Sequence, residues 1–231
     1  MDTYLYYEGE IVKFSDRTLT ILKNFATINP SLVFKPGYVL RTVSPQKTVM
    51  ANAIIEDEIP ANACVYDMSR FLSTCSLFNS PDIRFDQKRF VISEGKTETK
   101  YVYADKSMVI SAQDNDPVLP SKDVEVTVAW NDIQSVLKAS GVLKLPEIAF
   151  VGENGYCYLR AIDSSNPSAD TYGVELGETN DTFQLIIKTE NLKLLPFEYK
   201  VTLCSKGISK FESDVVYYFI AIESKSTYKK G

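Results

Sequence analysis

The 231-residue chain carries 30 acidic and 25 basic residues, a net charge of −5, and 45% of its residues are hydrophobic. This composition is typical of a folded globular protein with one large or two ordinary domains, and it argues against disorder and against a generally basic DNA-binding surface. The absence of histidine removes the usual general base and the commonest metal ligand, so we expect a protein that is not an enzyme, without a metal or cofactor.

The N-terminal segment MDTYLYYEGE is acidic and contains neither the basic nor the apolar region of a secretory signal. No later apolar run approaches the roughly 18 residues of a membrane span, so we expect a soluble intracellular protein with no membrane partner. The four cysteines are widely spaced in apolar surroundings, and we interpret them as reduced core residues.

Short β-rich runs separated by turn residues make up most of the chain, and the longest lie in 31–43, 82–93, 99–111, 147–162 and 215–222. Four segments change to helical spacing, with apolar residues at i, i+3, i+4 and i+7. These predicted helices span roughly 16–29, 66–78, 130–143 and 189–195, the last being short and ended by Pro196. The pattern predicts an α+β protein in which β-strands predominate.

The order of the helices indicates an internal duplication. The first and third helices are offset by about 116 residues and the second and fourth by about 122, although residue identity between the halves is faint. The segment 111–123 contains two prolines and three aspartates and has little periodicity, as expected for a connector. We therefore predict two similar β-sheet domains with two helices each, at 1–114 and 115–231.

Basic residues are concentrated on the predicted helices, whereas the rest of the chain is acidic. Each helix has an acidic residue near its start, which suits the helix dipole, and a basic residue further along its polar face. Four helices on one surface would make a mildly basic patch suited to sequence-independent phosphate contacts. The alternative is that these residues only solubilise four ordinary amphipathic helices. The candidates are Lys23, Arg70, Lys138 and Lys193, followed by Arg17, Lys144 and Lys188.

Several stretches, including LKNFATIN within 14–29, ACVYDMSRFLSTCSLFN (63–79), NLKLLPFEYKVTLCSKG (191–207) and KFESDVVYYFIAIES (210–224), resemble the sliding clamps of T-even-type bacteriophages. The resemblance extends from residue 14 to about residue 225. It implies a DNA-clamp fold in which three chains close head to tail into a homotrimeric ring, with helices facing the central hole. The residues listed above would then face the DNA.

The resemblance also implies partners. Clamps of this family encircle duplex DNA without sequence preference, hold the replicative DNA polymerase, and are loaded by an ATP-dependent clamp loader in the cytoplasm of the infected host cell. In these phages they also assist late transcription, which adds late-transcription factors as possible partners. The chain itself has no phosphate-binding loop motif, so the loader would supply the energy.

Clamp partners usually insert a short peptide into a pocket beside the interdomain connector. Val118, Leu119 and Pro120 form the apolar part of this connector, and we expect Tyr218 and Ile220 of the strand near the C-terminus to supply a neighbouring wall. Without the resemblance, that strand would be interpreted as part of the core.

Two other classes of protein compete with this interpretation. A structural β-rich phage virion protein would share the strand content and the acidic charge, but it would not require the repeated helices. An enzyme with paired carboxylates is less consistent with the sequence, because the densest acidic group, Glu56–Glu58, has the character of a solvated turn or strand end.

Overall fold

The computed structural model describes residues 9–231, and its packing divides the chain into two compact units. The first unit contains residues up to Lys47 together with Ala51–Gln113, and the second contains Asp114–Gly231 together with the short segment Thr48–Met50. The connector predicted at 111–123 therefore contains the point, after Gln113, at which the packing changes from one unit to the other. Each unit is described by itself.

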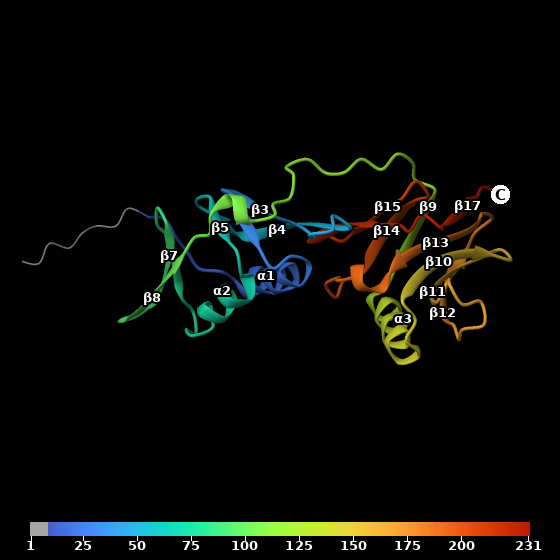
Figure 1. Cartoon of the computed structure of the whole chain (residues 1–231), viewed down its shortest axis with the longest axis horizontal. Helices are drawn as coiled ribbons and strands as arrows, with labels where there is room; N and C mark the ends of the chain where they lie inside the picture. The colour runs from blue at the N-terminus through green and yellow to red at the C-terminus, as the bar shows by residue number, and fades with distance from the viewer. Residues whose placement is uncertain (1–8) are drawn as a thin grey trace, which may run out of the picture. The chain divides into compact units, whose positions relative to one another are not determined.

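The first unit combines a four-stranded antiparallel sheet, ordered β1-β6-β7-β8, with the pair β2-β5 and with β3 beside β4. Helices α1 and α2 contact each other and lie on one side of these strands (Figure 1). The elements are β1 (Ile11–Val12), α1 (Asp16–Ile28), β2 (Leu32–Phe34), β3 (Gly37–Val43), β4 (Val49–Ile59), β5 (Ala63–Val65), α2 (Met68–Cys75), β6 (Asp82–Phe85), β7 (Arg89–Glu94), β8 (Thr97–Val102) and the 3-10 turn η1 (Lys106–Met108).

The second unit contains the antiparallel sheet β12-β11-β10-β13-β17 and the antiparallel run β16-β15-β14-β9. Helix α3 packs against β10, β11 and β12. The elements are β9 (Val124–Val128), α3 (Trp130–Leu143), β10 (Glu147–Glu153), β11 (Tyr156–Ile162), β12 (Tyr172–Glu178), β13 (Thr182–Lys188), the 3-10 turn η2 (Thr189–Asn191), β14 (Tyr199–Cys204), β15 (Ile208–Glu212), β16 (Val216–Ala221) and β17 (Thr227–Lys229).

Both units follow the same chain order: one strand, one helix, four strands, a helix or helical turn, and three strands. The pairing repeats as well, since β1 pairs with β6 as β9 pairs with β14, and β2 pairs with β5 as β10 pairs with β13. The second unit adds β17 at its end. This agreement of order and pairing is the structural form of the duplication that the helix offsets predict.

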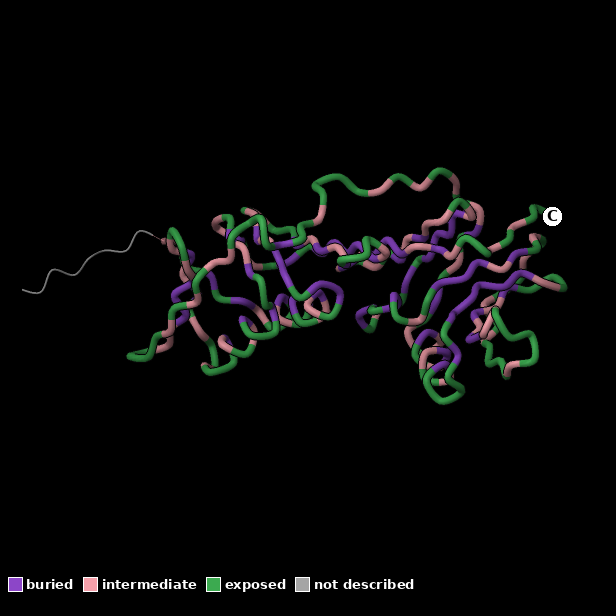
Figure 2. Tube along the Cα trace, viewed as in Figure 1, coloured by how far each residue is buried: buried purple, intermediate pink, exposed green. Residues whose placement is uncertain are grey.

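Aromatic side chains form the core of the first unit. Figure 2 marks the buried residues of each unit in purple along the backbone. Phe34 exposes none of its surface, and its ring lies 5.9–6.1 Å from the rings of Phe14, Phe71, Phe85 and Phe90. These rings come from β2, α2, β6, β7 and, for Phe14, the position before the N-cap residue Ser15 of α1. Edge and tilted contacts of this kind stabilise the fold beyond the burial of each ring. Phe34, on the three-residue strand β2, therefore links the sheet to the helices.

Helices α1, α2 and α3 confirm the predicted amphipathic pattern, with Leu22, Phe25, Met68, Phe71, Ile133 and Val136 buried. Ser15 caps α1 by accepting from the Thr18 amide at 3.2 Å, and Asp67 caps α2 by accepting from the Arg70 amide at 2.9 Å. No side chain caps α3; its first-turn Asp132 faces the positive end of the helix dipole. Helix α2 is shorter than the predicted 66–78: it begins at Met68, because Asp67 is its N-cap, and it ends at Cys75.

The predicted fourth helix at 189–195 is wrong, because the structure has only the 3-10 turn η2 there. Leu192, Leu194 and Leu195 are all buried, so this short segment has no single apolar stripe that a helix could bury. Its backbone is held instead by side chains: the Tyr218 hydroxyl accepts from the Leu195 amide at 3.2 Å, and the Tyr199 hydroxyl donates to the Leu195 carbonyl at 2.7 Å. Seven residues before a proline are also too few for a stable helix.

Among residues 9–231, no helix is long and apolar enough to cross a membrane.

One nearly buried ion pair makes the second unit sensitive to pH. The Glu147 side chain is 8% exposed, accepts from the Ser164 amide at 3.0 Å, and lies 2.5 Å from Lys225 Nζ. Burial by itself raises the pKa of Glu147, but Lys225 and Ser164 outweigh burial and lower the pKa below its usual value. Because folding lowers the pKa of Glu147, the ion pair stabilises the folded protein at pH values above the ordinary pKa of glutamate. This stabilisation is lost as the pH falls through the lowered pKa of the folded state.

Replacing Lys225 by Met should therefore destabilise the protein by about 1–2 kcal/mol at pH 7, since the carboxylate loses its partner. The deficit should shrink as pH falls towards 4, where an unpaired Glu147 becomes protonated. Thermal unfolding followed by circular dichroism across this range measures the difference, with the exposed-site variant Lys96→Met as a control. A deficit that is independent of pH would contradict the electrostatic explanation.

Candidate nucleic-acid interface

Each of the three helices exposes a predicted DNA-facing residue on the side opposite its buried stripe. Lys23 on α1, Arg70 on α2 and Lys138 on α3 are exposed, while Leu22, Phe71 and Val136 beside them are buried. The burial stripe of each helix fixes the direction of its basic residue, because residues one or two positions apart point to different sides of a helix. The helices can thus present positive charge without disturbing the core.

Arg17 carries less available charge than its position in α1 suggests. Its Nη1 lies 3.0 Å from Glu56 Oε1 on β4, and both side chains are about half exposed. A phosphate would have to compete with this carboxylate for the guanidinium group. The acidic run Glu56–Glu58 near the end of β4 thus bonds to residues at the start of α1. Besides the Arg17–Glu56 ion pair, Asp57 accepts from the Ser15 amide and hydroxyl at 2.9 Å each.

Arg70 lies at the edge of a hollow on the first unit. Its guanidinium carbon is 5.9 Å from the centroid of the Tyr101 ring, and Tyr66, Lys100 and Met108 line the same hollow. The aromatic ring supports the guanidinium group without neutralising it. Arg70 therefore remains a charged, exposed candidate.

The remaining three candidates are exposed but do not lie within helices. Lys144 follows α3 in the left-handed conformation (φ 56°), Lys188 ends β13, and Lys193 follows η2. The Thr189 amide donates to the Pro146 carbonyl at 3.0 Å, so the end of α3 and the start of η2 are adjacent. This contact brings Lys144 and Lys188 to one corner of the second unit, a proximity that sequence spacing alone does not reveal.

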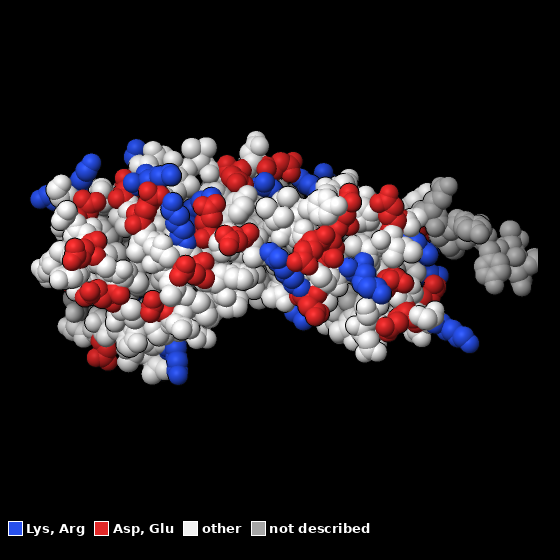
Figure 3. Space-filling model, turned by 180° about the vertical axis from the view of Figure 1, so that it is seen from behind, with Lys and Arg blue, Asp and Glu red and all other residues white. Residues whose placement is uncertain are grey.

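Acidic and basic side chains are interspersed on the face of the protein seen in Figure 3. This mixture agrees with the small net charge of −5. Any DNA contact therefore depends on a few local cations rather than on a generally positive field.

The connector leaves its apolar residues accessible. Val118 is 83% exposed, Leu119 is half-buried and Pro120 is exposed. Downstream, Asp123 accepts from the amide and the hydroxyl of Ser205 at 2.7 Å each and from Ser121. Burial would raise the pKa of Asp123, but these hydrogen bonds outweigh burial and lower the pKa. The Asp123 carboxylate, which holds the downstream end of the connector, is therefore ionised at neutral pH.

The prediction that Tyr218 and Ile220 wall a partner pocket is wrong, because both are completely buried. Tyr218 packs against Tyr199, with ring centroids 6.1 Å apart, and burial raises the pKa of its hydroxyl. Alternation along β16 places neighbouring residues on the opposite face. The period-2 pattern of this strand is the sequence signal that separates its buried residues from its exposed ones.

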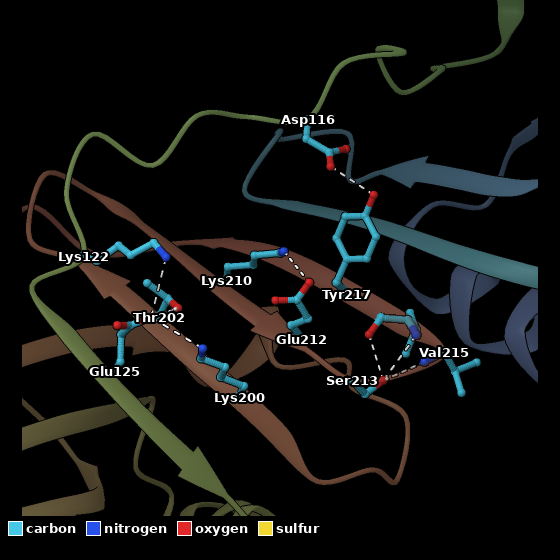
Figure 4. Close-up of polar contacts among 11 residues, drawn as sticks. Asp116, Lys122, Glu125, Lys200, Thr202, Lys210, Glu212, Ser213, Val215 and Tyr217 are labelled. Carbon is cyan, nitrogen blue, oxygen red and sulfur yellow. Dashed lines mark hydrogen bonds and ion pairs between the residues drawn. The ribbon is translucent and has the colours of Figure 1, made fainter.

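Tyr217 is the residue of β16 that reaches the connector. Figure 4 shows its side chain pointing to Asp116, and its hydroxyl donates to Asp116 Oδ2 at 3.0 Å. Lys210 Nζ lies 4.9 Å from the Tyr217 ring centroid and 2.6 Å from Glu212 Oε1. Tyr217 belongs to the strand predicted to wall the pocket, whereas Asp116 and Lys210 were not predicted. These three residues define the polar surface beneath the connector.

Residues 14–111 match the family described as DNA polymerase processivity factor, and residues 125–224 match the family described as gp45 sliding clamp, C terminal. The sliding clamp of Vibrio phage KVP40 is 34% identical over 220 residues, covering 92% of this chain and 100% of that protein. The sliding clamp of Enterobacteria phage T4 is 31% identical over 229 residues, covering 94% and 99%.

Solved structures agree at the level of fold. The A. fulgidus PCNA bound to the C-terminal region of FEN-1 has a TM-score of 0.68 at 13% identity, covering 95% of this chain and 100% of that chain. The PCNA2-PCNA3 complex of Sulfolobus tokodaii has a TM-score of 0.67 at 14% identity, covering 94% and 100%. With both units matched and relatives above 30% identity along almost the whole chain, the protein belongs to the phage sliding-clamp family of DNA polymerase processivity factors.

Proposed function

We propose that this clamp acts without catalysis, as a homotrimeric ring that encircles duplex DNA and slides along it while holding the replicative polymerase. The observation that carries this proposal is the exposure of Lys23, Arg70 and Lys138 on three helices whose opposite faces are buried. With few cations on the DNA side, phosphate contacts are weak and independent of sequence. Topology then retains the DNA, and weak contacts let the ring move.

Ring closure requires a surface on one chain that fits a different surface on the next. Such a heterologous contact gives a closed ring when its rotation closes after a whole number of subunits. The outer strands of the sheets in both units pair on one side only within residues 9–231, and their other edge could pair with a strand of the next chain. We propose three subunits by the resemblance to the phage clamps.

Loading and wider roles are further parts of the proposal. The chain contains no phosphate-binding loop, so a separate ATP-dependent clamp loader would open the ring. By analogy with the phage relatives, the clamp would act in the cytoplasm of the infected host cell and also assist late transcription. The family matches favour this function over the alternative of a structural virion protein.

The polymerase would bind through a peptide at the connector. The archaeal PCNA structure holds the C-terminal region of FEN-1, which makes peptide binding plausible for this fold. In the present chain, Val118 and Leu119 offer apolar contacts above the Tyr217 and Lys210 surface. An extended peptide could bury Val118, and removing this apolar side chain from water would favour binding.

The double charge reversal Lys23→Glu/Lys138→Glu tests the DNA surface. Because it replaces attraction to phosphate by repulsion, processivity on primed circular DNA with loader and polymerase should fall on the order of 10-fold. The matched control Lys229→Glu/Lys230→Glu changes net charge equally, at the last residue of β17 and the residue after it, and should retain processivity. Equal losses in both variants would refute a specific role for the helices.

The solution mass tests the ring. Light scattering of the wild-type chain should give the mass of three 26.0 kDa chains at high concentration and a lower mass on dilution. A strict monomer at every concentration, or an open polymer that keeps growing, would contradict the closed trimer.

The substitution Val118→Asp tests the connector. A charge at this exposed site should weaken binding of the polymerase to the clamp about 10-fold, because the contact would have to desolvate a carboxylate. Binding measured by calorimetry would be compared with that of Asp114→Asn, which changes the connector without removing an apolar group. Thermal stability should be unchanged, since Val118 is 83% exposed.

A further inference from the structure

A hollow of about 600 Å³ lies on the second unit, and connector residues 111–123 take no part in its lining. The end of β9, the segment leading into β14 and the turn Ser213–Val215 between β15 and β16 form its walls. Pockets of this volume accept a drug-sized ligand, so the hollow has room for one or two large side chains. We call it the acidic hollow, and its defining residues are Phe197, Glu198, Glu212, Asp214 and Val215.

The apolar part of the acidic hollow comes from the two sides. Phe197 lies in the segment before β14, Val215 lies in the turn before β16, and both side chains are half-buried. Each therefore keeps apolar surface in contact with water, and covering that surface favours binding of another apolar group.

Both walls are held in place by hydrogen bonds within the chain. Ser213 Oγ accepts from the Val216 amide at 3.2 Å and donates to the Val216 carbonyl at 2.8 Å, which closes the turn (Figure 4). On the other side, the Tyr199 hydroxyl and the Phe197 amide donate to the Leu195 carbonyl at 2.7 and 2.9 Å. A partner would not have to order these segments, so the entropic cost of binding is reduced.

Carboxylates dominate the rim of the acidic hollow. Glu198, Glu212 and Asp214 are all exposed there, together with a single lysine, Lys200. Lys200 Nζ lies 3.9 Å from Glu125 Oε1, and Figure 4 shows its side chain directed towards Glu125 and away from the turn. The local field inside the hollow is therefore negative.

Two of the three carboxylates are available to an outside cation. Lys210 Nζ lies 2.6 Å from Glu212 Oε1 and occupies that carboxylate. Glu198 and Asp214, by contrast, form no ion pair within residues 9–231. A cation placed between the walls would gain charge-assisted hydrogen bonds without breaking an existing pair.

We propose that the acidic hollow binds a segment of a partner protein in which a lysine or arginine lies next to an apolar residue. The apolar side chain packs against Phe197 and Val215, and the cation bonds to Glu198 or Asp214. The same carboxylates repel DNA and acidic peptides, so charge selects a basic segment. The site is additional to the connector surface and does not depend on the proposed ring.

A labelled, end-capped peptide of four alternating arginine–leucine pairs is the probe, and fluorescence anisotropy measures its binding to the full-length chain. Glu198→Gln/Asp214→Asn removes two charges at constant shape and should weaken binding about 10-fold in low salt, with a smaller loss in high salt. The nearly isosteric Val215→Thr should weaken binding about 3-fold. The control Asp170→Asn/Glu178→Gln makes the same changes at exposed positions of the second unit and should bind like wild type.

Equal binding by Glu198→Gln/Asp214→Asn and its control, or no binding by wild type at millimolar peptide, would overturn the site. A probe with serine in place of leucine should bind about 3-fold more weakly; equal binding would reduce the contact to charge attraction and overturn the apolar part. Val118→Ser should leave the affinity unchanged, and a loss there would assign the peptide to the connector instead.

Sedimentation velocity and circular dichroism complete the test. Without peptide, Glu198→Gln/Asp214→Asn should sediment like wild type across concentrations. A change in self-association would show that a second copy of the chain occupies the hollow, and it would overturn the assignment to a partner protein. Unchanged circular dichroism of each variant separates lost binding from lost folding.

Discussion

Backbone hydrogen bonding at the sheet edges is the constraint on which the assembly of this clamp depends. An antiparallel sheet satisfies its N–H and C=O groups everywhere except along its outer strands, and only closure or a partner removes that deficit. Here the short strands β1 and β17 limit one edge of each sheet, whereas β8 and β12 are long. In both sheets, one outer strand therefore offers many more unpaired backbone groups than the other.

The electrostatic design follows from the same arrangement of helices and sheets. Each helix buries its apolar stripe in the core and exposes only its polar face, which carries one or two basic residues per helix. Arg17 shows how this charge is limited further, because Glu56 lies 3.0 Å from its guanidinium group. An acidic body with a few exposed cations disfavours tight binding of a polyanion anywhere on the surface.

The sequence predicted the elements whose pattern is local and missed those that depend on distant contacts. Helices α1 and α3 were predictable because a full amphipathic stripe lies within each segment. The segment after β13 was not, because its leucines are buried by β14 and β16, and Tyr199 and Tyr218 hold the Leu195 backbone from those strands. Similarly, Asp116 and Tyr217 are 101 residues apart, and only the fold reveals their hydrogen bond.

The connector and the edge strand β8 illustrate two ways of using exposed apolar surface. Val118 is displayed on a chain segment held downstream by Asp123, so a partner can bury it without changing the core of either unit. Val102 instead lies on a rigid strand whose neighbour Tyr101 packs against Phe71 in the aromatic core, with ring centroids 5.4 Å apart. The connector can therefore change its contacts without disturbing the core of either unit, whereas the position of β8 is fixed by the packing of Tyr101 against Phe71.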